Sequence, residues 1–292
     1  MAGDEIEFLK RELKKKGYPL ENYVQSVLAS KEWHIQPNAY FLDKDTNKGR
    51  ELDIKASLEI DTDKFWNHLV TLLIQCKKVT GNAWIFFSSP SPPFRRICKH
   101  SLNDFLHFGY YGIFDIKGTY YEKNAVATNY CEIIVDPKKS NKRVDNIWES
   151  VITLIKATSE EFDFIKNDTE QYIEEEISVN DFLKKPFELV EIIYPLIVFE
   201  GKIYEAKFSN NDISLIPREQ IQLYIDYISG KYKGIFCIDI ISKERLTKYL
   251  DNTLKDLTLF NERKKENSKK YREDMIRALK EHLSKMHTHY VE

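Results

Sequence analysis

The sequence lacks the features that mark several common protein classes. Its 292 residues include only four cysteines, with no CxxC pair among them, which argues against a zinc knuckle or a disulfide framework. The N-terminal segment MAGDEIEFLK is acidic and has no apolar core, so it is not typical of a signal peptide. The longest apolar run, IIYPLIVF at 192–199, is far too short to span a bilayer. We therefore expect a cytoplasmic protein.

Motifs for several kinds of chemistry are also missing. Neither GxxxxGK[ST] nor GxGxxG occurs, which argues against a built-in nucleotide motor. Cys98 and His100 follow a proline-rich loop without obvious partner ligands, and three further histidines lie in the C-terminal tail, where solvated side chains are usual: His282, His287 and His289.

The net charge is only −2, although residues 243–287 hold 13 Lys or Arg against 8 acids. Such a basic tail suits phosphate binding, but it is equally typical of a solvated helix.

The periodicity that is present predicts a mixed α/β protein. Helices are expected at 4–17, 19–33, 144–176, 217–229 and 243–257, with a charged helix from about 259. Strands are expected at 34–42, 50–60, 68–78, 83–88 and 233–241, and as a hairpin over 189–208. Residues 1–130 carry the motifs described below. Residues 131–258 are expected to complete or extend the same sheet, and 259–292 to form a charged helical tail.

Two of the expected strands, 50–60 and 68–78, are separated by a turn-rich segment. If they form an antiparallel hairpin about residues 63–66, opposed positions sum to about 129. Asp53 then lies opposite residues 75–77. Because side chains alternate along a strand, we expect the polar side chains of both strands to share one face of the sheet.

Helix 19–33 adds a second carboxylate to this region. Its buried face is predicted from apolar residues at helical spacing, namely Leu20, Val24, Val27 and Leu28. Glu21 lies at the rim of that face. A helix docked on the sheet by this face would bring Glu21 to the cluster formed by Asp53, Gln75 and Lys77.

Such a cluster suits the hydrolysis of a phosphodiester. Mg²⁺ is held by one or two carboxylates and keeps several waters, one of which can attack phosphorus. We expect Glu21 and Asp53 to be metal ligands, Gln75 to coordinate or position the metal, and the Cys76 carbonyl to be an extra ligand. Lys77 can orient the water or contact the scissile phosphate. Because Gln75 carries no charge, the metal should bind more weakly than at a site with three acids.

The order Glu21, Asp53, Gln75-Cys76-Lys77 resembles the PD-(D/E)xK nuclease superfamily, and the hydrophobic-QCK form is similar to its Mrr-like branch of type IV restriction endonucleases. The resemblance covers residues 17–90. The sequence departs from the pattern in two ways. It has Arg-Glu-Leu-Asp where a glycine often precedes the aspartate, and no helix directly follows the QCK strand. A helix at 144–157, leading to a strand at 189–199, is then the expected crossover.

This resemblance implies a restriction-endonuclease-like mixed sheet flanked by helices, elaborated in its C-terminal half and closed by a charged helix. It also implies a metal-dependent endonuclease that cleaves nucleic acid, most simply DNA, with Mg²⁺ or Mn²⁺. A homodimer is expected because one such site cuts one strand. A role in restriction or antiviral defence, with partner proteins of a defence system, follows from the resemblance alone.

Three other interpretations remain open at this stage. The chain could be a catalytically decayed nuclease fold that serves as a binding or assembly module, with Gln75 marking the decay. It could also be an α/β interaction protein with no nuclease ancestry. A second ExK sequence, Glu205-Ala206-Lys207, is ranked lower, because a hairpin turning at Glu200–Lys202 would place no carboxylate opposite it.

Overall fold

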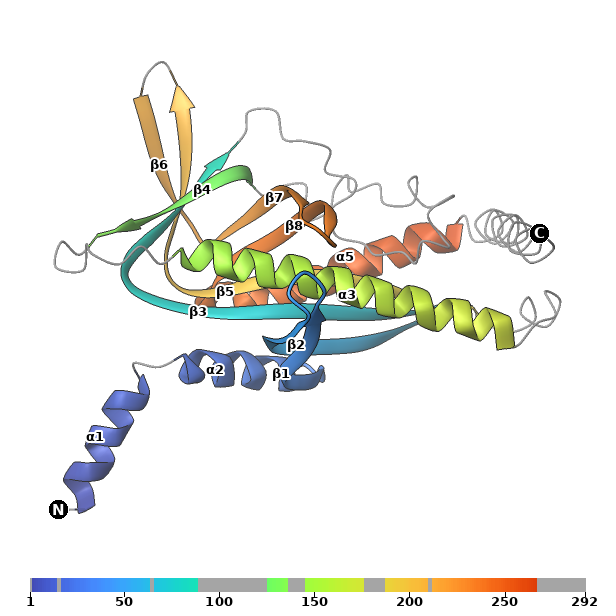
Figure 1. Ribbon diagram of the computed structural model, residues 1–292, viewed down its shortest axis with the longest axis horizontal. Helices are drawn as coiled ribbons and strands as arrows, with labels where there is room; N and C mark the ends of the chain where they lie inside the picture. Colours follow the sequence, from blue (N-terminus) through green and yellow to red (C-terminus); the bar gives the residue numbers. More distant parts are fainter. Residues whose placement is uncertain are drawn as a thin grey trace.

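The computed structural model describes residues 2–14, 17–63, 66–88, 125–135, 145–175, 187–209 and 212–266. In these ranges the helices are α1 (Ala2–Lys14), α2 (Tyr18–Ala29), α3 (Asn146–Glu175), the short 3-10 helix η5 (Lys243–Arg245) and α5 (Leu246–Glu266). The strands are β1 (His34–Asp43), β2 (Lys48–Asp63), β3 (Trp66–Ser88), β4 (Val126–Ile134), β5 (Phe187–Ser209), β6 (Asp212–Arg218), β7 (Gln220–Ile228) and β8 (Lys233–Ser242). Figure 1 shows helices packed on both sides of a strongly curved sheet, with α1 standing away from the rest.

All eight described strands belong to one mixed sheet, in the order β1-β2-β3-β4-β7-β8-β5-β6. Its two longest strands, β3 and β5, run parallel and pair along most of their length. Parallel neighbours require a crossover connection, and α3 lies on the chain between them and packs across the sheet. The mixed α/β class expected from the sequence is thus confirmed.

The strand pairings also form a closed cycle. Along one edge β3 pairs first with β2 and then with β4, while β5 follows its other edge. The pairings β4–β7, β7–β8 and β8–β5 lead back from β4 to β5. Among the described strands, β1 and β6 therefore pair on one side only.

The first side of the sheet is covered by α2 and α5. Apolar side chains of α2 pack there in the expected helical spacing, namely Leu20, Val24 and Leu28. They meet alternate residues of β3, represented by Leu72, Ile74 and Cys76, and the α5 side chains Leu246, Tyr249 and Leu250. We call this the α2 face. It fixes the position of α2, and hence of Glu21, relative to β3.

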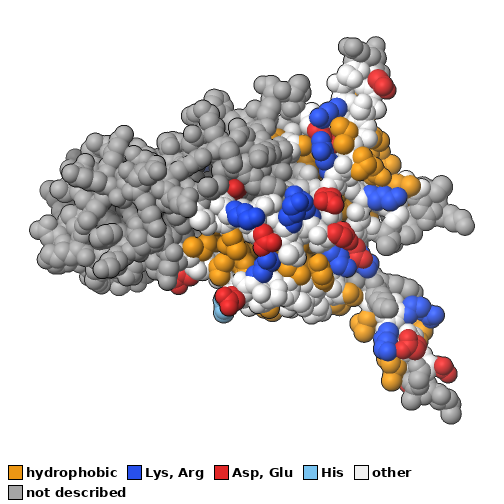
Figure 2. Space-filling view, turned by 180° about the vertical axis from the view of Figure 1, so that it is seen from behind, with side chains coloured by type: hydrophobic (Ala, Val, Ile, Leu, Met, Phe, Trp, Pro, Cys, Tyr) orange, Lys and Arg blue, Asp and Glu red, His pale blue; other side chains and the backbone are white. Residues whose placement is uncertain are grey.

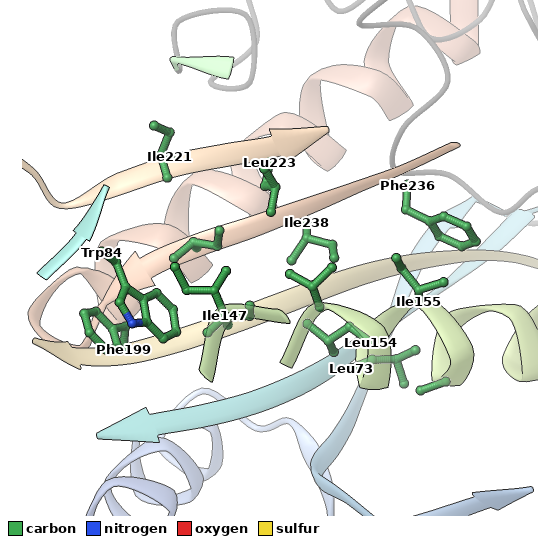
Figure 3. Close-up of a cluster of buried hydrophobic side chains, with 14 of the residues drawn as sticks. Leu73, Trp84, Ile147, Leu154, Ile155, Phe199, Ile221, Leu223, Phe236 and Ile238 are labelled. Carbon is green, nitrogen blue, oxygen red and sulfur yellow. The ribbon is translucent and has the colours of Figure 1, made fainter. Parts of the chain in front are cut away.

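The second side is covered by α3 and is called the α3 face. Its buried cluster draws on α3 and on all five strands of the closed cycle, as Figure 3 shows for residues including Leu73, Ile147, Ile221 and Ile238. The rings of Trp84 and Phe199 stack with centroids 3.8 Å apart, which ties the far half of β3 to β5.

The β1–β2 hairpin passes from one face to the other. Ile54 packs on the α2 face but Leu52 packs on the α3 face, although alternation would place both on the same side. The change occurs at Asp53, opposite Asn38, whose φ of 50° lies in the left-handed region. The regular alternation expected for β2 is therefore interrupted at Asp53.

Beyond this break the hairpin is anchored on α3 by a buried ionic group. Lys156 on α3 donates to Asp43 at 2.8 Å and 3.0 Å and lies 2.9 Å from a carboxylate oxygen of Asp45. Arg50 also pairs with Asp43, which is fully buried. Burial alone would raise the pKa of Asp43, but the hydrogen bonds from Lys156 and Arg50 hold it well below its usual range.

Most of the expected elements are present. Helices occupy the expected positions near 4–17, 19–33, 144–176 and 243–257, and strands occupy those near 34–42, 50–60, 68–78 and 233–241. β4 was not predicted. The charged C-terminal helix begins as the end of α5, which reaches Glu266, and residues 267–292 lie outside the described ranges.

Three sequence expectations are wrong. Residues 217–229 form the strands β6 and β7 in place of a helix. The separate strands at 68–78 and 83–88 are one strand, β3, with a register shift between Lys78 and Ala83. The hairpin over 189–208 is the single strand β5. Its Gly201 is no turn residue: the Phe199 ring packs so closely that an added Cβ would lie 2.3 Å from it.

Candidate functional site

The candidate site lies where β2 and β3 separate. The hairpin turns between Asp63 and Trp66, and its antiparallel register extends to the pair Ile54 and Ile74, close to the predicted alignment. There the Cys76 N–H donates to Asp53 Oδ2 at 2.6 Å instead of to the neighbouring backbone. The carboxylate thus takes the place of the next ladder hydrogen bond, and the end of the pairing opens the sheet beside Asp53.

The Cys76 hydrogen bond fixes one oxygen of Asp53. Burial raises the pKa of Asp53, while the Cys76 N–H and the Lys77 charge lower it and the charge of Glu51 raises it. On balance the pKa is above its usual value, so the ionised carboxylate is not fully compensated by the groups around it.

Glu21 reaches the same place from the first turn of α2. Its Oε1 lies close to Gly17: a Cβ added to Gly17 would be 3.2 Å from this oxygen. Burial raises the pKa of Glu21, the charges of Asp53 and Glu51 raise it further, and Lys77 lowers it. Glu21, Asp53 and Lys77 are therefore close enough for their charges to act on one another, and Glu51 is a third acid within this range.

Glu51 was not assigned a role from the sequence. It is exposed on β2 and accepts a hydrogen bond from the Tyr40 hydroxyl at 3.1 Å. The sequence could have indicated Glu51 by its position two residues before Asp53, because residues two apart on a regular strand share a face. The charges that act on Glu21 and Asp53 thus include two other acids each but only one amine, Lys77, and a bound cation would relieve this excess of negative charge.

Gln75 is buried next to this group. Its amide is close enough to Asp53 to contribute a small lowering of that pKa, but its Nε2 makes no hydrogen bond within the described part of the chain. A buried amide nitrogen without a hydrogen bond costs stability, so packing alone does not account for a glutamine at this position.

The donor set is compatible with a weakly held Mg²⁺ or Mn²⁺. Glu21 and Asp53 supply two carboxylates, and one or two are what Mg²⁺ usually takes from a protein. A strand residue directs its N–H and C=O to the same edge, so the Cys76 carbonyl points toward Asp53 as well. Among the described residues, however, no three His, Cys, Asp or Glu side chains form a group able to hold a metal.

A basic rim borders the site, and the sequence did not reveal it. Lys78 donates to Glu200 at 2.6 Å, and Lys243 lies 3.4 Å from the same carboxylate and 4.9 Å from the ring centre of Tyr23 on α2. The parallel register of β3 and β5 pairs Lys78 with Glu200. Lys243 directly follows Ser242, the last residue of β8, which pairs with Phe199 of β5. Only this strand order joins residues so far apart in the sequence.

The second ExK sequence has a structural role. Glu205 is buried and pairs with Arg218 of β6, and its pKa, which burial would raise, is lowered by Ser88 and Arg218. Glu205 thus belongs to a structural ion pair, while Lys207 remains half exposed. Cys98, His100 and the three tail histidines lie outside the described residues.

The chain matches no family model, no curated protein and no solved structure. Of the described helices, none is long and apolar enough to cross a membrane. On the side shown in Figure 2, acidic and basic side chains of the described residues are interspersed.

Replacing Gln75 by Glu is expected to raise the affinity for Mn²⁺. The change adds a carboxylate of nearly the same shape beside Asp53, and Mn²⁺ favours charged oxygen ligands. Isothermal titration with Mn²⁺ measures the difference, with Ser26→Glu at an exposed position of α2, away from Glu21, as a control for added charge. An unchanged dissociation constant would remove Gln75 from the metal site.

Replacing Asp53 by Asn is expected to stabilise the metal-free protein. The raised pKa of Asp53 means that folding opposes its charge at neutral pH. Asn removes that charge, and its carbonyl oxygen can still accept the Cys76 N–H. Thermal unfolding in EDTA should show a gain on the order of 1 kcal/mol, typical of a single site.

The stability cost of the Asp53 charge depends on pH, because the direction of the pKa shift decides where the cost is present. For a carboxyl with a raised folded pKa, the cost of folding is present above that pKa and disappears as the pH falls below the unfolded value of about 3.9. The gain from Asp53→Asn should shrink accordingly in acid. A variant less stable than wild type at neutral pH would show that Asp53 is held by a favourable ion pair.

Proposed function

We propose that this protein is a metal-dependent nuclease that hydrolyses phosphodiester bonds, with DNA as its substrate and Mg²⁺ or Mn²⁺ as its cofactor. The observation that carries the proposal is the Asp53 carboxylate at the point where β2 and β3 separate, bound by the Cys76 N–H and close enough to Glu21 and Lys77 for their charges to act on one another. Two acids with raised pKa values and one amine supply the charges that this chemistry needs.

Each residue has a distinct part in the proposed reaction. Glu21 and Asp53 would hold the cation, with the Cys76 carbonyl and Gln75 beside them. When bound, the cation lowers the pKa of a coordinated water and neutralises charge on the phosphate. Lys77 would orient the attacking water or stabilise the negative charge that develops on the phosphate oxygens.

The basic rim suits the same substrate. Lys78 and Lys243 share a single carboxylate, Glu200, so the rim carries one uncompensated positive charge next to the acidic site. A phosphate backbone could follow the rim while one phosphate enters the acidic site, because backbone contacts position a nucleic acid without reading its sequence.

A direct test is to incubate the purified protein with plasmid, linear duplex, single-stranded DNA and RNA, each with Mg²⁺, Mn²⁺ or EDTA. We expect metal-dependent cleavage of DNA and none in EDTA. Asp53→Ala should abolish both cleavage and Mn²⁺ binding, because the site then loses a charged ligand. Cleavage that persists in EDTA, or in Asp53→Ala, would contradict the proposed site.

One observation favours a second function, that of a nucleic-acid-binding or assembly module without activity. The position of the third site acid is held by the neutral Gln75, and the described residues include no group of three metal-binding acids. Titration with Mn²⁺ separates the two functions. The nuclease should bind the ion through Glu21 and Asp53, whereas a decayed site should bind DNA without it.

The resemblance to type IV restriction endonucleases extends the proposal to a role in restriction or defence against foreign DNA. Plating of phage on cells that express the protein tests this role. Protection by wild type that is lost in Asp53→Ala would support it, and equal plating efficiency on both strains would argue against it.

A further inference from the structure

The helix α1 exposes an apolar stripe that no described part of the chain covers. Ile6, Leu9 and Leu13 follow the spacing i, i+3, i+7 and are 52%, 50% and 56% exposed. Helix α1 contacts mainly the neighbouring α2, and it stands away from the body in Figures 1 and 2. A helix of 13 residues is marginal without tertiary packing, so its stability calls for a partner on this stripe.

Charged residues beside the stripe indicate which partner fits. The spacing of Ile6, Leu9 and Leu13 corresponds to a, d and a positions of a heptad, which puts Glu5 and Glu12 at g and Lys10 at e. In a parallel pair of helices, a g residue faces the e residue five positions later in the partner. Glu5 of one copy would then face Lys10 of the other, twice in a symmetric pair.

An antiparallel pair is disfavoured by the same residues. In that arrangement g positions face g positions, so Glu5 would meet Glu12 of the second copy. Lys10 is available for a new partner, because its ion pair with Glu7 at 2.8 Å has both side chains largely exposed and contributes little. Ile at an a position with Leu at d is also typical of two-stranded parallel pairs.

We propose that α1 is a self-association helix that pairs in parallel with α1 of a second copy of this chain. The apolar stripes form the seam, and the Glu5–Lys10 pairs set the orientation. Parallel pairing places both bodies at the same end of the helix pair, which would present two candidate sites to one duplex. That last consequence rests on the proposed function, whereas the dimer itself does not.

Charge exchange tests the pairing. Sedimentation velocity over a wide range of protein concentration should show a monomer–dimer equilibrium for wild type. Glu5→Lys should weaken it roughly tenfold or more, because two exposed attractions become repulsions, and the double variant Glu5→Lys with Lys10→Glu should recover part of the loss. Asp4→Lys is the matched control: it reverses the same charge in the same helical turn, but on the opposite side from the stripe.

Disulfide trapping tests the orientation. Leu9→Cys should form a covalent dimer under mild oxidation, because identical seam positions face each other in a parallel pair, whereas Phe8→Cys on the opposite side should not. A wild type that stays monomeric at every concentration would overturn the proposal, as would equal weakening by Asp4→Lys and Glu5→Lys. Efficient trapping of Phe8→Cys but not Leu9→Cys would overturn the assigned seam. None of these readouts depends on nuclease activity.

Discussion

Replacing Lys77 by alanine is expected to reduce DNA cleavage by about 10²–10³-fold, the usual cost of one electrostatic contact made in the transition state. Metal binding should remain close to wild type, because the ammonium group is not a ligand and only partly offsets the charges of Glu21 and Asp53. Thermal stability should change by no more than about 1 kcal/mol, as for a partly exposed charge. Plasmid cleavage, Mn²⁺ titration and thermal unfolding measure the three quantities.

The neighbouring Lys78 provides the matched control. It has the same side chain one position later, but it pairs with Glu200 on β5 and not with the acids of the site. Lys78→Ala should retain most of the cleavage rate and weaken substrate binding at most modestly. If Lys77→Ala and Asp53→Ala both lower the melting temperature strongly, the two residues form a structural ion pair and the nuclease proposal fails at its centre.

Replacing Lys156 by methionine is expected to cost about 3 kcal/mol of stability, the lower end of the range for breaking a buried ion pair. The Lys156 and Asp43 side chains are 6% and 0% exposed, so the change leaves Asp43 buried with one charged partner fewer. Arg50 remains bound to Asp43, which is why the lower value applies. Urea unfolding measures the loss, and Lys44→Met, which breaks more exposed pairs with Glu160 and Asp163, should cost at most about 1 kcal/mol.

The same ion pair should weaken in acid. A carboxyl whose folded pKa is depressed, as that of Asp43 is, contributes stability above its unfolded pKa of about 3.9 and loses it as the pH falls through the folded value. The difference in stability between wild type and Lys156→Met should therefore be constant near neutral pH and decrease in acid. Equal stability of the two proteins at neutral pH would show that Lys156 is dispensable for the hairpin anchor.

The sequence was most informative where local and long-range signals agreed. The apolar spacing of α2, with Leu20, Val24 and Leu28, predicted both the helix and the side that packs on the sheet. The β2–β3 hairpin was predicted because its turn-rich segment fixed the register, and the observed pairs lie within one residue of the expected sum. These two elements were enough to bring Glu21 toward Asp53 and Lys77.

Residues 217–229 show where sequence periodicity was insufficient. Ile221, Tyr224, Ile225 and Ile228 fit helical spacing, but Ile221, Leu223 and Ile225 fit the alternation of a strand equally well. The choice was decided by β8, which pairs with the whole of β7, and by a core position for Ile221 and Leu223 on the α3 face. The partner strand β8 lies outside residues 217–229, so the periodicity within that segment cannot show the pairing.

The sequence by itself determined the mixed α/β class, the packing face of α2, the β2–β3 hairpin and the residue types of the candidate site. Only the tertiary structure decided that β2 breaks its alternation at Asp53, that the Cys76 N–H binds this carboxylate, and that Lys78 and Lys243 share Glu200. The physical reason is that local periodicity fixes which side of an element is buried, whereas strand order and the burial of charge depend on contacts between residues far apart in the chain.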